Sequence, residues 1–453
     1  MKKNLEQQRI AVLGLGDTGF SALRWLRHMG AEVTMFDSRL QPPGLDRLQH
    51  DFPGVAYHLG PFDAALFASM DMIVLSPGIA LREPAVQQAQ AQGVSVVGDV
   101  ELFARYRPAF AKVIAITGSN GKTTTTSLVG EICKQAGLNT IVAGNIGLPV
   151  LDTLFMPAPD VYVLELSSFQ LETTHSLRAD AATVLNVSED HMDRYDDMQA
   201  YAQAKARIYQ HARIAVVNRE DAASVQLAGG LPQVSFGANP APTLSDYGLD
   251  ESGWLCAGRR RCIESDALQI RGKHNIANAL AAIALCQAIG VDKISILNAV
   301  QTFKGLPHRV EWVATLDDVD YYDDSKGTNV GATCAAIGGM LKQGQPQKVV
   351  LIAGGDGKGQ DFGPLREPVM QNARAVVLIG RDAPNIQQVL QGCQVPVVDA
   401  VDLPAAVNIA RTLAEPGDAV LLSPACASFD MFRNYVHRAE VFVAAVRALE
   451  VPC

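Results

Sequence analysis

Short apolar runs alternate with longer amphipathic stretches along the whole chain of 453 residues. The apolar runs are rich in β-branched residues and predict buried strands at residues 10–13, 32–36, 72–75, 112–116, 161–166, 182–186, 214–218, 349–353, 375–379 and 419–422. The stretches between them predict helices at residues 20–29, 123–136, 198–211, 274–289, 294–303 and 428–449. This alternation is typical of parallel βαβ units, so we expect an α/β protein.

Two interruptions of this pattern divide the chain into three parts. Residues 105–109 break it just before a strand that leads into a glycine-rich loop, and residues 305–308 end a helical pattern before new strands begin near Val310. We therefore expect domains at residues 1–107, 108–307 and 308–453, which are ordinary domain sizes. Residues 223–270 are rich in Gly, Pro and Ser and are expected to form a β-rich excursion of the middle domain.

Composition excludes several classes of protein. Lys and Arg number 38 against 47 Asp and Glu, which gives a formal charge of −9 and disfavours a nucleic-acid binder. The basic run at 259–261 is short and is expected to be a solvated loop. No apolar stretch approaches the roughly 18 residues of a membrane span. The eight cysteines form no CxxC pair and suit a reducing compartment. We expect no nucleic-acid partner, no membrane insertion and a cytoplasmic location.

A glycine-rich loop between a predicted strand and a predicted helix is the strongest local signal. Its spacing is Gly-x-x-Gly-Lys-Thr, a short variant of the common phosphate loop. Glycines let backbone N–H groups surround phosphate oxygens, the lysine supplies a charge, and the threonine hydroxyl can ligate Mg²⁺. We expect ATP or GTP to bind at Gly118, Ser119, Asn120, Gly121, Lys122, Thr123 and Thr124.

A second glycine motif opens the chain. Gly14, Gly16 and Gly19 match G-x-G-x-x-G after a strand, and Asp37 follows the second strand, which is typical of Rossmann-like dinucleotide sites. Taken alone, this pattern indicates a nicotinamide oxidoreductase. The motif reports only a backbone that can approach a diphosphate, and a domain of about 107 residues leaves little room for hydride transfer. We therefore favour a nucleotide-diphosphate substrate here.

Acidic and basic residues follow the strands of the middle segment. Glu165 ends an apolar strand, where a carboxylate can hold the Mg²⁺ of a nucleotide, and His191 follows the next strand beside several acids. Lys205 lies within a mostly apolar predicted helix. From the residues alone, we interpret it as a surface lysine whose ammonium group extends into solvent.

Seven motifs in order resemble the Mur ligase family, and the resemblance covers essentially the whole chain. They are Thr-Gly-Ser-Asn-Gly-Lys-Thr at 117–123, Gly-Asn-Ile-Gly at 144–147, Glu-Leu-Ser-Ser-Phe-Gln at 165–170, Asn-Val-Ser-Glu-Asp-His-Met-Asp at 186–193, Gly-Lys-His-Asn-Ile-Ala-Asn-Ala at 272–279, Gly-Leu-Pro-His-Arg at 305–309 and Asp-Ser-Lys-Gly-Thr-Asn at 324–329. The resemblance implies a Rossmann-like N-terminal domain, a central phosphate-loop ATP-binding domain and a Rossmann-like C-terminal domain.

The resemblance also implies a reaction. ATP would phosphorylate the carboxylate of UDP-N-acetylmuramoyl-L-alanine, and the amine of D-glutamate would attack the acyl phosphate to give an amide, ADP and phosphate. The implied cofactors are ATP and two Mg²⁺ ions, the implied location is the bacterial cytoplasm, and we expect a monomer. The absence of Asp-Asn-Pro-Arg, typical of relatives that add a diamino acid, favours D-glutamate.

Residue roles follow from the same resemblance. Catalytic roles would fall to Lys122, His191, Lys205 and Lys326. The metal ligands would be Thr123, Glu165, His191 and a carbamylated Lys205. Further ATP contacts would come from Asn278, Arg309, Asp324 and Lys326. The UDP substrate would contact Leu15, Gly16, Asp17, Thr18, Asp37, Ser38, Arg39, Gly78, Asn145 and His191. D-glutamate would contact Thr328, Lys358, Ser428 and Phe429, with Ser428 at the start of a helix.

Four alternatives stay open at this point. A folylpolyglutamate synthase would perform the same type of reaction, but those enzymes begin at the ATP domain. Another Mur ligase would take a different amine. A non-catalytic nucleotide sensor would keep the loops without turnover, and an NAD oxidoreductase would bind nicotinamide.

Overall fold

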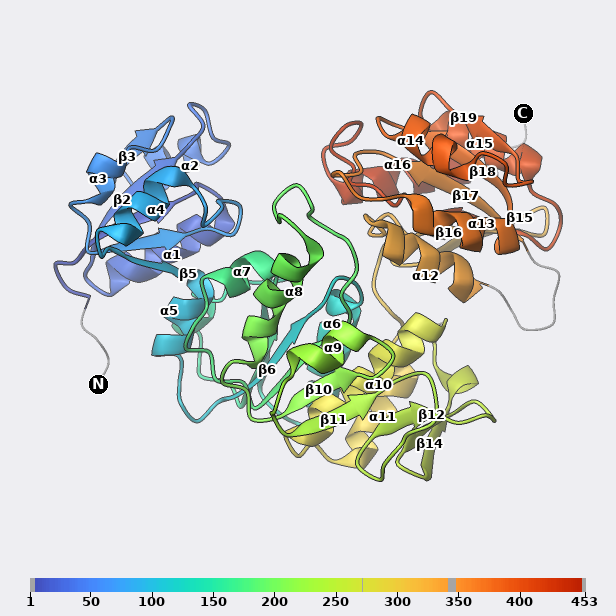
Figure 1. Ribbon diagram of the computed structural model, residues 1–453, viewed down its shortest axis with the longest axis horizontal. Helices are drawn as coiled ribbons and strands as arrows, with labels where there is room; N and C mark the ends of the chain where they lie inside the picture. The colour runs from blue at the N-terminus through green and yellow to red at the C-terminus, as the bar shows by residue number, and fades with distance from the viewer. Residues whose placement is uncertain (1–4, 271, 341–347, 450–453) are drawn as a thin grey trace.

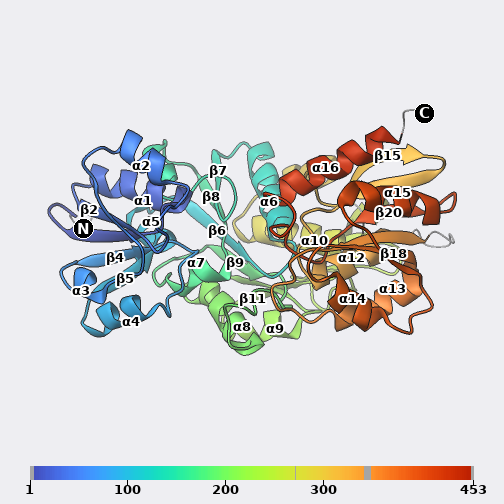
Figure 2. The same cartoon turned by 90° about the horizontal axis from the view of Figure 1, so that it is seen from above.

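Three lobes lie in a row in the structure, which is a computed structural model. It describes residues 5–270, 272–340 and 348–449. Each lobe is built around one sheet, and the central lobe separates the other two in both views (Figure 1, Figure 2). Within the described residues, no helix has the length and apolar character needed to cross a membrane.

The N-terminal lobe contains a parallel sheet in the order β3-β2-β1-β4-β5, as expected for a Rossmann-like unit. Its strands are β1 (Arg9–Leu13), β2 (Glu32–Asp37), β3 (Ala56–Leu59), β4 (Met72–Leu75) and β5 (Ser95–Gly98). Its helices are α1 (Asp17–His28), α2 (Leu45–Asp51), α3 (Ala64–Phe67), α4 (Pro84–Ala91) and α5 (Asp99–Tyr106).

The central lobe contains the largest sheet among the described residues, in the order β14-β13-β12-β11-β10-β9-β6-β8-β7. The strands are β6 (Lys112–Thr117), β7 (Thr140–Gly144), β8 (Val161–Glu165), β9 (Ala181–Val184), β10 (Ala215–Asn218), β11 (Gln233–Phe236), β12 (Tyr247–Leu249), β13 (Trp254–Ala257) and β14 (Arg260–Glu264). The helices are α6 (Lys122–Gln135), η1 (Asp152–Phe155), α7 (Ser168–Glu172), α8 (Met198–Ala206), η2 (Arg207–Tyr209), α9 (Ala222–Leu227), η3 (Ser265–Ala267), α10 (Lys273–Ala288) and α11 (Lys293–Thr302). Pairing is parallel from β7 to β12 and antiparallel from β12 to β14.

The C-terminal lobe has the sheet order β15-β16-β20-β17-β18-β19, with only β15 and β16 antiparallel among the described pairs. Its strands are β15 (Glu311–Leu316), β16 (Val319–Asp323), β17 (Val349–Gly354), β18 (Ala373–Ile379), β19 (Val397–Asp399) and β20 (Ala419–Leu422). Its helices are α12 (Val330–Met340), η4 (Gly363–Leu365), α13 (Arg366–Asn372), α14 (Ala383–Leu390), α15 (Leu403–Leu413) and α16 (Tyr435–Ala448).

The predicted α/β class and the ten predicted strands are confirmed, and 223–270 contains the expected β-rich excursion. Two of the strands that the pattern missed, β3 and β19, are largely exposed or only partly buried, so they carry no continuous run of buried apolar residues. Each sheet lies within one predicted domain, although the exact boundaries at 107 and 307 stay a prediction.

Two predicted segments were wrong in detail. The helix expected from residue 428 begins at Tyr435, because Asn434 caps it by accepting from the N–H of His437 and the chain before it forms tight turns. The expected loop at 259–261 continues into the edge strand β14, where Arg261 pairs with Asp250 at 2.6 Å.

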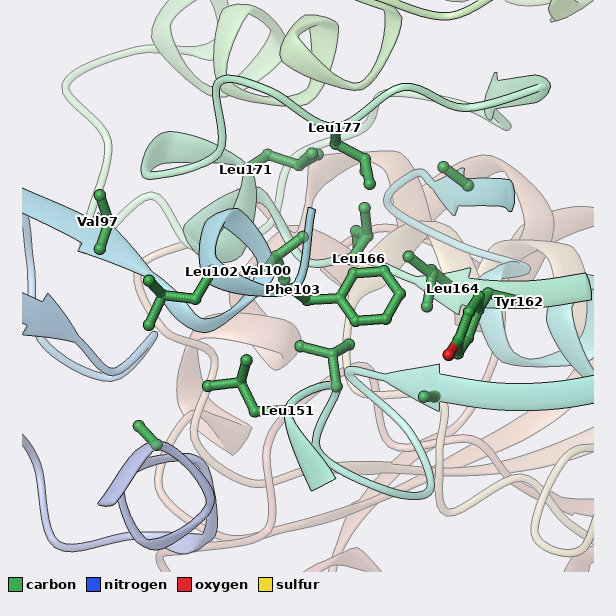
Figure 3. Packing of buried hydrophobic residues seen from close by; sticks show 14 of the residues in the cluster. Val97, Val100, Leu102, Phe103, Leu151, Tyr162, Leu164, Leu166, Leu171 and Leu177 are labelled. Carbon is green, nitrogen blue, oxygen red and sulfur yellow. The ribbon is translucent and has the colours of Figure 1, made fainter. Parts of the chain in front are cut away.

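One apolar cluster joins the N-terminal and central lobes. Phe103 of α5 is fully buried and meets Tyr162 of β8 edge to face, with ring centroids 4.9 Å apart. Figure 3 shows Phe103 surrounded by leucines that come from both sides of this junction. Among the described residues, the buried apolar clusters of the C-terminal lobe include no residue of the central lobe. The N-terminal junction is therefore a packed apolar core, whereas no buried apolar cluster of the described residues spans the C-terminal junction.

We expect Phe103→Ala to lower the free energy of unfolding by about 3–5 kcal/mol, because it removes a large buried side chain from this shared core. Urea unfolding followed by circular dichroism measures the loss. Phe110→Ala is the matched control, since Phe110 is 73% exposed and its replacement should change stability by less than about 0.5 kcal/mol. Similar losses in both variants would contradict the prediction.

Candidate functional site

The phosphate loop lies between β6 and α6, as the sequence predicts. Gly121 caps α6 with a left-handed φ of 81°, and a side chain added there would collide with Asn278 of α10. The Lys122 ammonium donates to the carbonyls of Gly118 and Ser119 at 2.7 and 2.8 Å, so it folds back over its own loop. A left-handed loop at a helix N-terminus presents N–H groups to an anion, so this geometry suits phosphate.

The side chains of Ser119 and Asn120 support the loop. The Ser119 hydroxyl donates to the carbonyl of Ser188 and accepts from the N–H of Ser188. The backbone N–H of Ser119 donates to the Asn186 carbonyl. The Asn186 amide accepts from the N–H of Asn120 and donates to its carbonyl, at 2.8 and 3.0 Å. The loop shape is thus fixed from the segment that directly follows β9, a role for Asn186 that the sequence reasoning missed.

Glu165 ends β8 beside this loop and is 1% exposed. One carboxylate oxygen accepts from Asn145 Nδ2 at 2.8 Å, and the other is buried without a hydrogen-bond partner among the described residues. A buried, unpaired carboxylate oxygen is costly unless a cation or a proton compensates it. Glu165 and the nearby Thr123 hydroxyl therefore fit a Mg²⁺ ion carried by the nucleotide.

Lys205 is 1% exposed and donates to the Gly118 carbonyl at 2.9 Å. The interpretation of Lys205 as a surface lysine was therefore wrong, because α8 buries its side chain against the phosphate loop and over the Tyr201 ring. Burial, and then the charge of Lys122, lower the pKa of Lys205 well below its usual value. A lowered pKa leaves more of the amine neutral and nucleophilic.

His191 lies in the loop after β9 with a left-handed φ of 60°. Its Nε2 is 3.7 Å from Asp190 Oδ2, and its ring meets that of Phe169 at 4.8 Å. Burial lowers the pKa of His191 to about 4, so the imidazole is neutral at pH 7 and able to ligate a cation.

Side chains of the C-terminal lobe reach both the phosphate loop and the loop after β9 that carries Asp190 and His191. Arg309 Nη2 donates to the Thr123 hydroxyl at 3.1 Å, and Asn329 Nδ2 donates to Asn120 Oδ1 at 3.0 Å. The Lys358 ammonium lies 2.6 Å from Asp190 Oδ1. Residues far apart in sequence thus meet here, and they include Arg309 and Lys358, which the sequence analysis assigned to ATP and to D-glutamate.

Four cationic side chains share this place: Lys122, Lys205, Arg309 and Lys326. Burial, and then repulsion from Arg309, lower the pKa of Lys326 to about 8, and burial also lowers the pKa of Lys122. Asp324 is buried beside them, and burial raises its pKa to about 7 although Ser423 donates to it at 2.7 Å. So many cations around few carboxylates suit a polyanion such as a triphosphate.

A cavity of about 220 Å³ continues from the phosphate loop between the central and C-terminal lobes. Gly121, His274, Asn278 and Arg309 are among the residues that line it. Its mixed polar and apolar wall and its position fit a nucleoside attached to the phosphates. His274 is a lining residue that the sequence reasoning quoted in a motif without assigning it a role.

The predicted UDP residues gather at the carboxyl edge of the N-terminal sheet. Asp37 is buried, accepts from the N–H of Leu15 at 3.0 Å and pairs with Arg39 at 2.8 Å. Burial pushes the pKa of Asp37 up, but these hydrogen bonds outweigh it and leave the pKa below its usual value. At Gly16, which precedes α1, no atom would touch an added side chain, so the helix N-terminus is open to a ligand.

The remaining predicted residues of this edge are mostly exposed. The side chain of Asp17 is 89% exposed and pairs with Arg47, and Gly78 lies in the turn after β4. Thr18 lies in the first turn of α1, and Ser38 directly follows β2. Asn145 orients Glu165, which is a second task beside the predicted substrate contact.

The residues predicted to contact D-glutamate differ in their exposure to solvent. Thr328 is half-buried after β16, Ser428 is buried in the turns before α16, and Phe429 is 75% exposed. Ser428 is not at a helix N-terminus, so the expected helix-dipole contribution at this residue is wrong. It lies instead in a tight turn, with its carbonyl accepting from Phe432 at 2.8 Å.

One further group of possible metal ligands was not predicted. His308, Glu311 and Asp323 bring ligand atoms within 4.8 Å of one another. Asp323 already accepts from His308 and Ser325, so its oxygens are satisfied without an ion. We assign no metal to this group.

The geometry defines a nucleotide-binding α/β protein whose site joins two lobes, and comparison with known proteins identifies its family. Residues 8–98 match the Mur ligase MurD-like N-terminal domain, residues 116–286 the Mur ligase middle domain, and residues 308–426 the Mur ligase glutamate ligase domain. The chain belongs to the Mur ligase family.

Curated relatives match over almost the full length. A UDP-N-acetylmuramoylalanine–D-glutamate ligase of Methylobacillus flagellatus is 60% identical over 98% of both chains, and one of Thiobacillus denitrificans is 56% identical over 98% of this chain and 97% of that one. Among solved structures, MurF from Acinetobacter baumannii aligns with a TM-score of 0.62 at 19% identity, covering 97% and 93% of the two chains. UDP-N-acetylmuramate-alanine ligase MurC from Thermotoga maritima aligns at 0.59 with 20% identity, covering 98% and 100%. These structures confirm the three-lobed fold.

Burial, and then the charge of Arg309, lower the pKa of His274 from 6.5 to about 4. Between about pH 4 and pH 6.5, the imidazole of His274 binds a proton in the unfolded chain but not in the folded protein. The contribution of His274 to stability is therefore complete above pH 6.5 and is lost as the pH falls. We expect His274→Gln to reduce the slope of unfolding free energy against pH by up to about 1.4 kcal/mol per pH unit.

Urea titrations of both proteins at several pH values between about 7 and 5 measure this slope. Buried carboxyl groups such as Asp324, whose raised pKa acts in the opposite direction, cancel in the comparison. Equal slopes in the variant and the wild type would contradict the lowered pKa of His274.

Proposed function

We propose that this protein joins D-glutamate to UDP-N-acetylmuramoyl-L-alanine with hydrolysis of ATP to ADP and phosphate, in the synthesis of peptidoglycan precursors. The observation that carries the proposal is that side chains of the C-terminal lobe meet the central lobe at its phosphate site. Arg309 and Asn329 contact the phosphate loop, and Lys358 pairs with Asp190 in the loop after β9. The 60% identical relative named for this activity, which matches almost its full length, supports the choice of substrates.

A carboxylate does not react with an amine at neutral pH, so the reaction needs a better leaving group. The substrate carboxylate would attack the γ-phosphorus of ATP, and the bond to the β-phosphate oxygen would break to release ADP. The amine of D-glutamate would then attack the acyl carbon, form the C–N bond, lose a proton and expel phosphate. Lys122, Arg309 and Lys326 would neutralise the charge of the transferred phosphoryl group.

Two Mg²⁺ ions would complete the site. Thr123 and Glu165 are the proposed ligands of the first ion, and the unpaired oxygen of Glu165 supports this assignment. His191 and Lys205 are the proposed ligands of the second. When bound, the ions supply charge stabilisation for phosphoryl transfer.

Lys205 would act as its carbamate. A neutral amine adds to CO₂ with loss of a proton, which turns a buried cation into an anion that can ligate metal. The lowered pKa and complete burial of Lys205 support this chemistry. The carbamate would also relieve its repulsion with Lys122.

The two other substrates have proposed sites on either side. The carboxyl edge of the N-terminal sheet, with Gly16, Asp37 and Gly78, would hold the UDP-sugar, as helix N-termini there favour diphosphates. Lys358, Thr328 and Ser428 would bind D-glutamate, with Phe429 nearby. We propose a cytoplasmic monomer, with no nucleic acid as partner.

Phosphate release from ATP with UDP-N-acetylmuramoyl-L-alanine tests the function directly. We expect release with D-glutamate and at least about a hundredfold less with L-glutamate, meso-diaminopimelate, L-lysine or no amino acid, because binding groups left unpaired in a wrong acceptor cost several kcal/mol. Release with another amine would keep the mechanism and change the acceptor. Absence of release from folded, ATP-binding protein would reject the proposed UDP-sugar substrate.

We expect Lys205→Ala to lower kcat by at least about a hundredfold, and added formate or acetate to restore part of it by supplying the missing carboxylate. The matched control is Lys293→Ala, which removes an exposed lysine on α11 and should neither lose activity nor respond to the acids. Failure of every acid to restore a folded, ATP-binding variant would contradict the carbamate.

A further inference from the structure

Arg194 occupies the junction of the N-terminal and central lobes, three residues after His191. Its side chain is 13% exposed, so a permanent charge is largely removed from water. No role has been given to it by the motifs or by the reaction described above. A charge buried at this depth must be compensated, and its partners define what it does.

The guanidinium group contacts both lobes. Nη1 donates to the Pro77 carbonyl at 2.8 Å and Nη2 to the Ile79 carbonyl at 3.1 Å, which are the residues on either side of Gly78. Nη2 also lies 3.3 Å from Glu172 Oε2 at the end of α7. A planar, forked donor suits two neighbouring carbonyls, whereas a lysine ammonium would not reproduce this pattern.

The guanidinium group of Arg194 is also connected to His191 through the ring of Phe169, which contacts both side chains. The guanidinium carbon of Arg194 lies 4.0 Å from the centroid of the Phe169 ring, and the His191 ring contacts Phe169 at 4.8 Å. The N–H of Arg194 also donates to the His191 carbonyl at 2.9 Å, which closes the left-handed turn at His191. α7, which carries Phe169, lies between α5 of the N-terminal lobe and α8 (Figure 1).

We propose that Arg194 is a positioning residue that fixes the Gly78 turn of the N-terminal lobe relative to His191, and so sets the UDP-linked carboxylate in line with the transferred phosphate. This inference rests on the proposed function, because it needs the UDP-sugar at Gly78 and the phosphoryl group near His191. Placement matters at this site, since an error of about 1 Å between reacting groups costs on the order of a hundredfold in rate.

The test uses steady-state kinetics of the full chain with Arg194→Ala and Arg194→Lys. We expect Arg194→Ala to raise KM for the UDP-sugar and lower kcat, each by about tenfold or more, because buried carbonyls and a carboxylate lose their donor. KM for ATP and for D-glutamate should stay within about threefold. Guanidinium ion, far below denaturing concentrations, should restore part of the activity of Arg194→Ala, and Arg194→Lys should remain impaired.

Arg82→Ala is the matched control. Arg82 joins the same two loops, through Asp196 and the Asp193 carbonyl, but it is 53% exposed and does not touch Phe169 or the Gly78 turn's carbonyls. Its replacement should leave all kinetic constants within about twofold. An equal defect in Arg82→Ala would overturn the assignment to Arg194 by showing that loop docking in general is responsible.

Other outcomes also decide the question. Unchanged constants in Arg194→Ala, or equal changes for all three substrates, would overturn the inference. If Arg194→Ala fails to fold, wild-type kinetics in Arg194→Lys would do the same. A wild type without turnover would reject the proposed function instead, and calorimetric binding of UDP-N-acetylmuramoyl-L-alanine to wild type and variants would still test Arg194 separately.

Discussion

Removal of cationic side chains from water is the electrostatic constraint on which the site around the phosphate loop depends. Lys122, Lys205 and Lys326 each have a lowered pKa because burial and neighbouring positive charges disfavour their protonated forms. Glu165 and Asp190 offset only part of this charge, and one Glu165 oxygen has no partner among the described residues. The site is therefore organised for charges that a ligand brings, with phosphate oxygens for the lysines and a divalent cation for the carboxylate.

The two junctions of the molecule differ in the same physical sense. Apolar side chains such as Phe103 pack continuously from the N-terminal into the central lobe, so separating these lobes would expose a core. The C-terminal lobe contacts the loops around the phosphate site through hydrogen bonds and an ion pair, such as Asn329 with Asn120 of the phosphate loop and Lys358 with Asp190 of the loop after β9. Water and substrates can replace such partners at modest cost, so this junction can admit ligands without loss of the fold.

Arg194 shows how the packed junction of the N-terminal and central lobes can serve the proposed chemistry. In the proposed reaction, a substrate held at the N-terminal lobe must reach a phosphate held at the central lobe, and Gly78 and His191 both lie in loops that follow strands. The fork of hydrogen bonds to Pro77 and Ile79, together with the contact through Phe169, connects these loops in a single side chain. In the proposed role of Arg194, reaction geometry depends on a residue that needs no contact with any substrate.

The sequence alone determined the α/β class, most buried strands, and the phosphate loop, because these depend on local hydrophobic periodicity and on glycines at fixed spacing. Its order of motifs was sufficient to identify the family. Partly exposed strands such as β3 lacked a continuous apolar run, and the start of α16 depended on the cap at Asn434.

Tertiary structure alone decided which polar residues meet. Lys205 reads as a surface residue in its own helix, and only the packing of α8 against the phosphate loop buries it. The pairs between Asn186 and Asn120 and between Lys358 and Asp190 join segments tens to more than a hundred residues apart, and Arg194 reaches carbonyls of another lobe. No local pattern encodes such contacts, because they arise from how the sheets and their loops are placed in space, and burial then sets the charge state of each group.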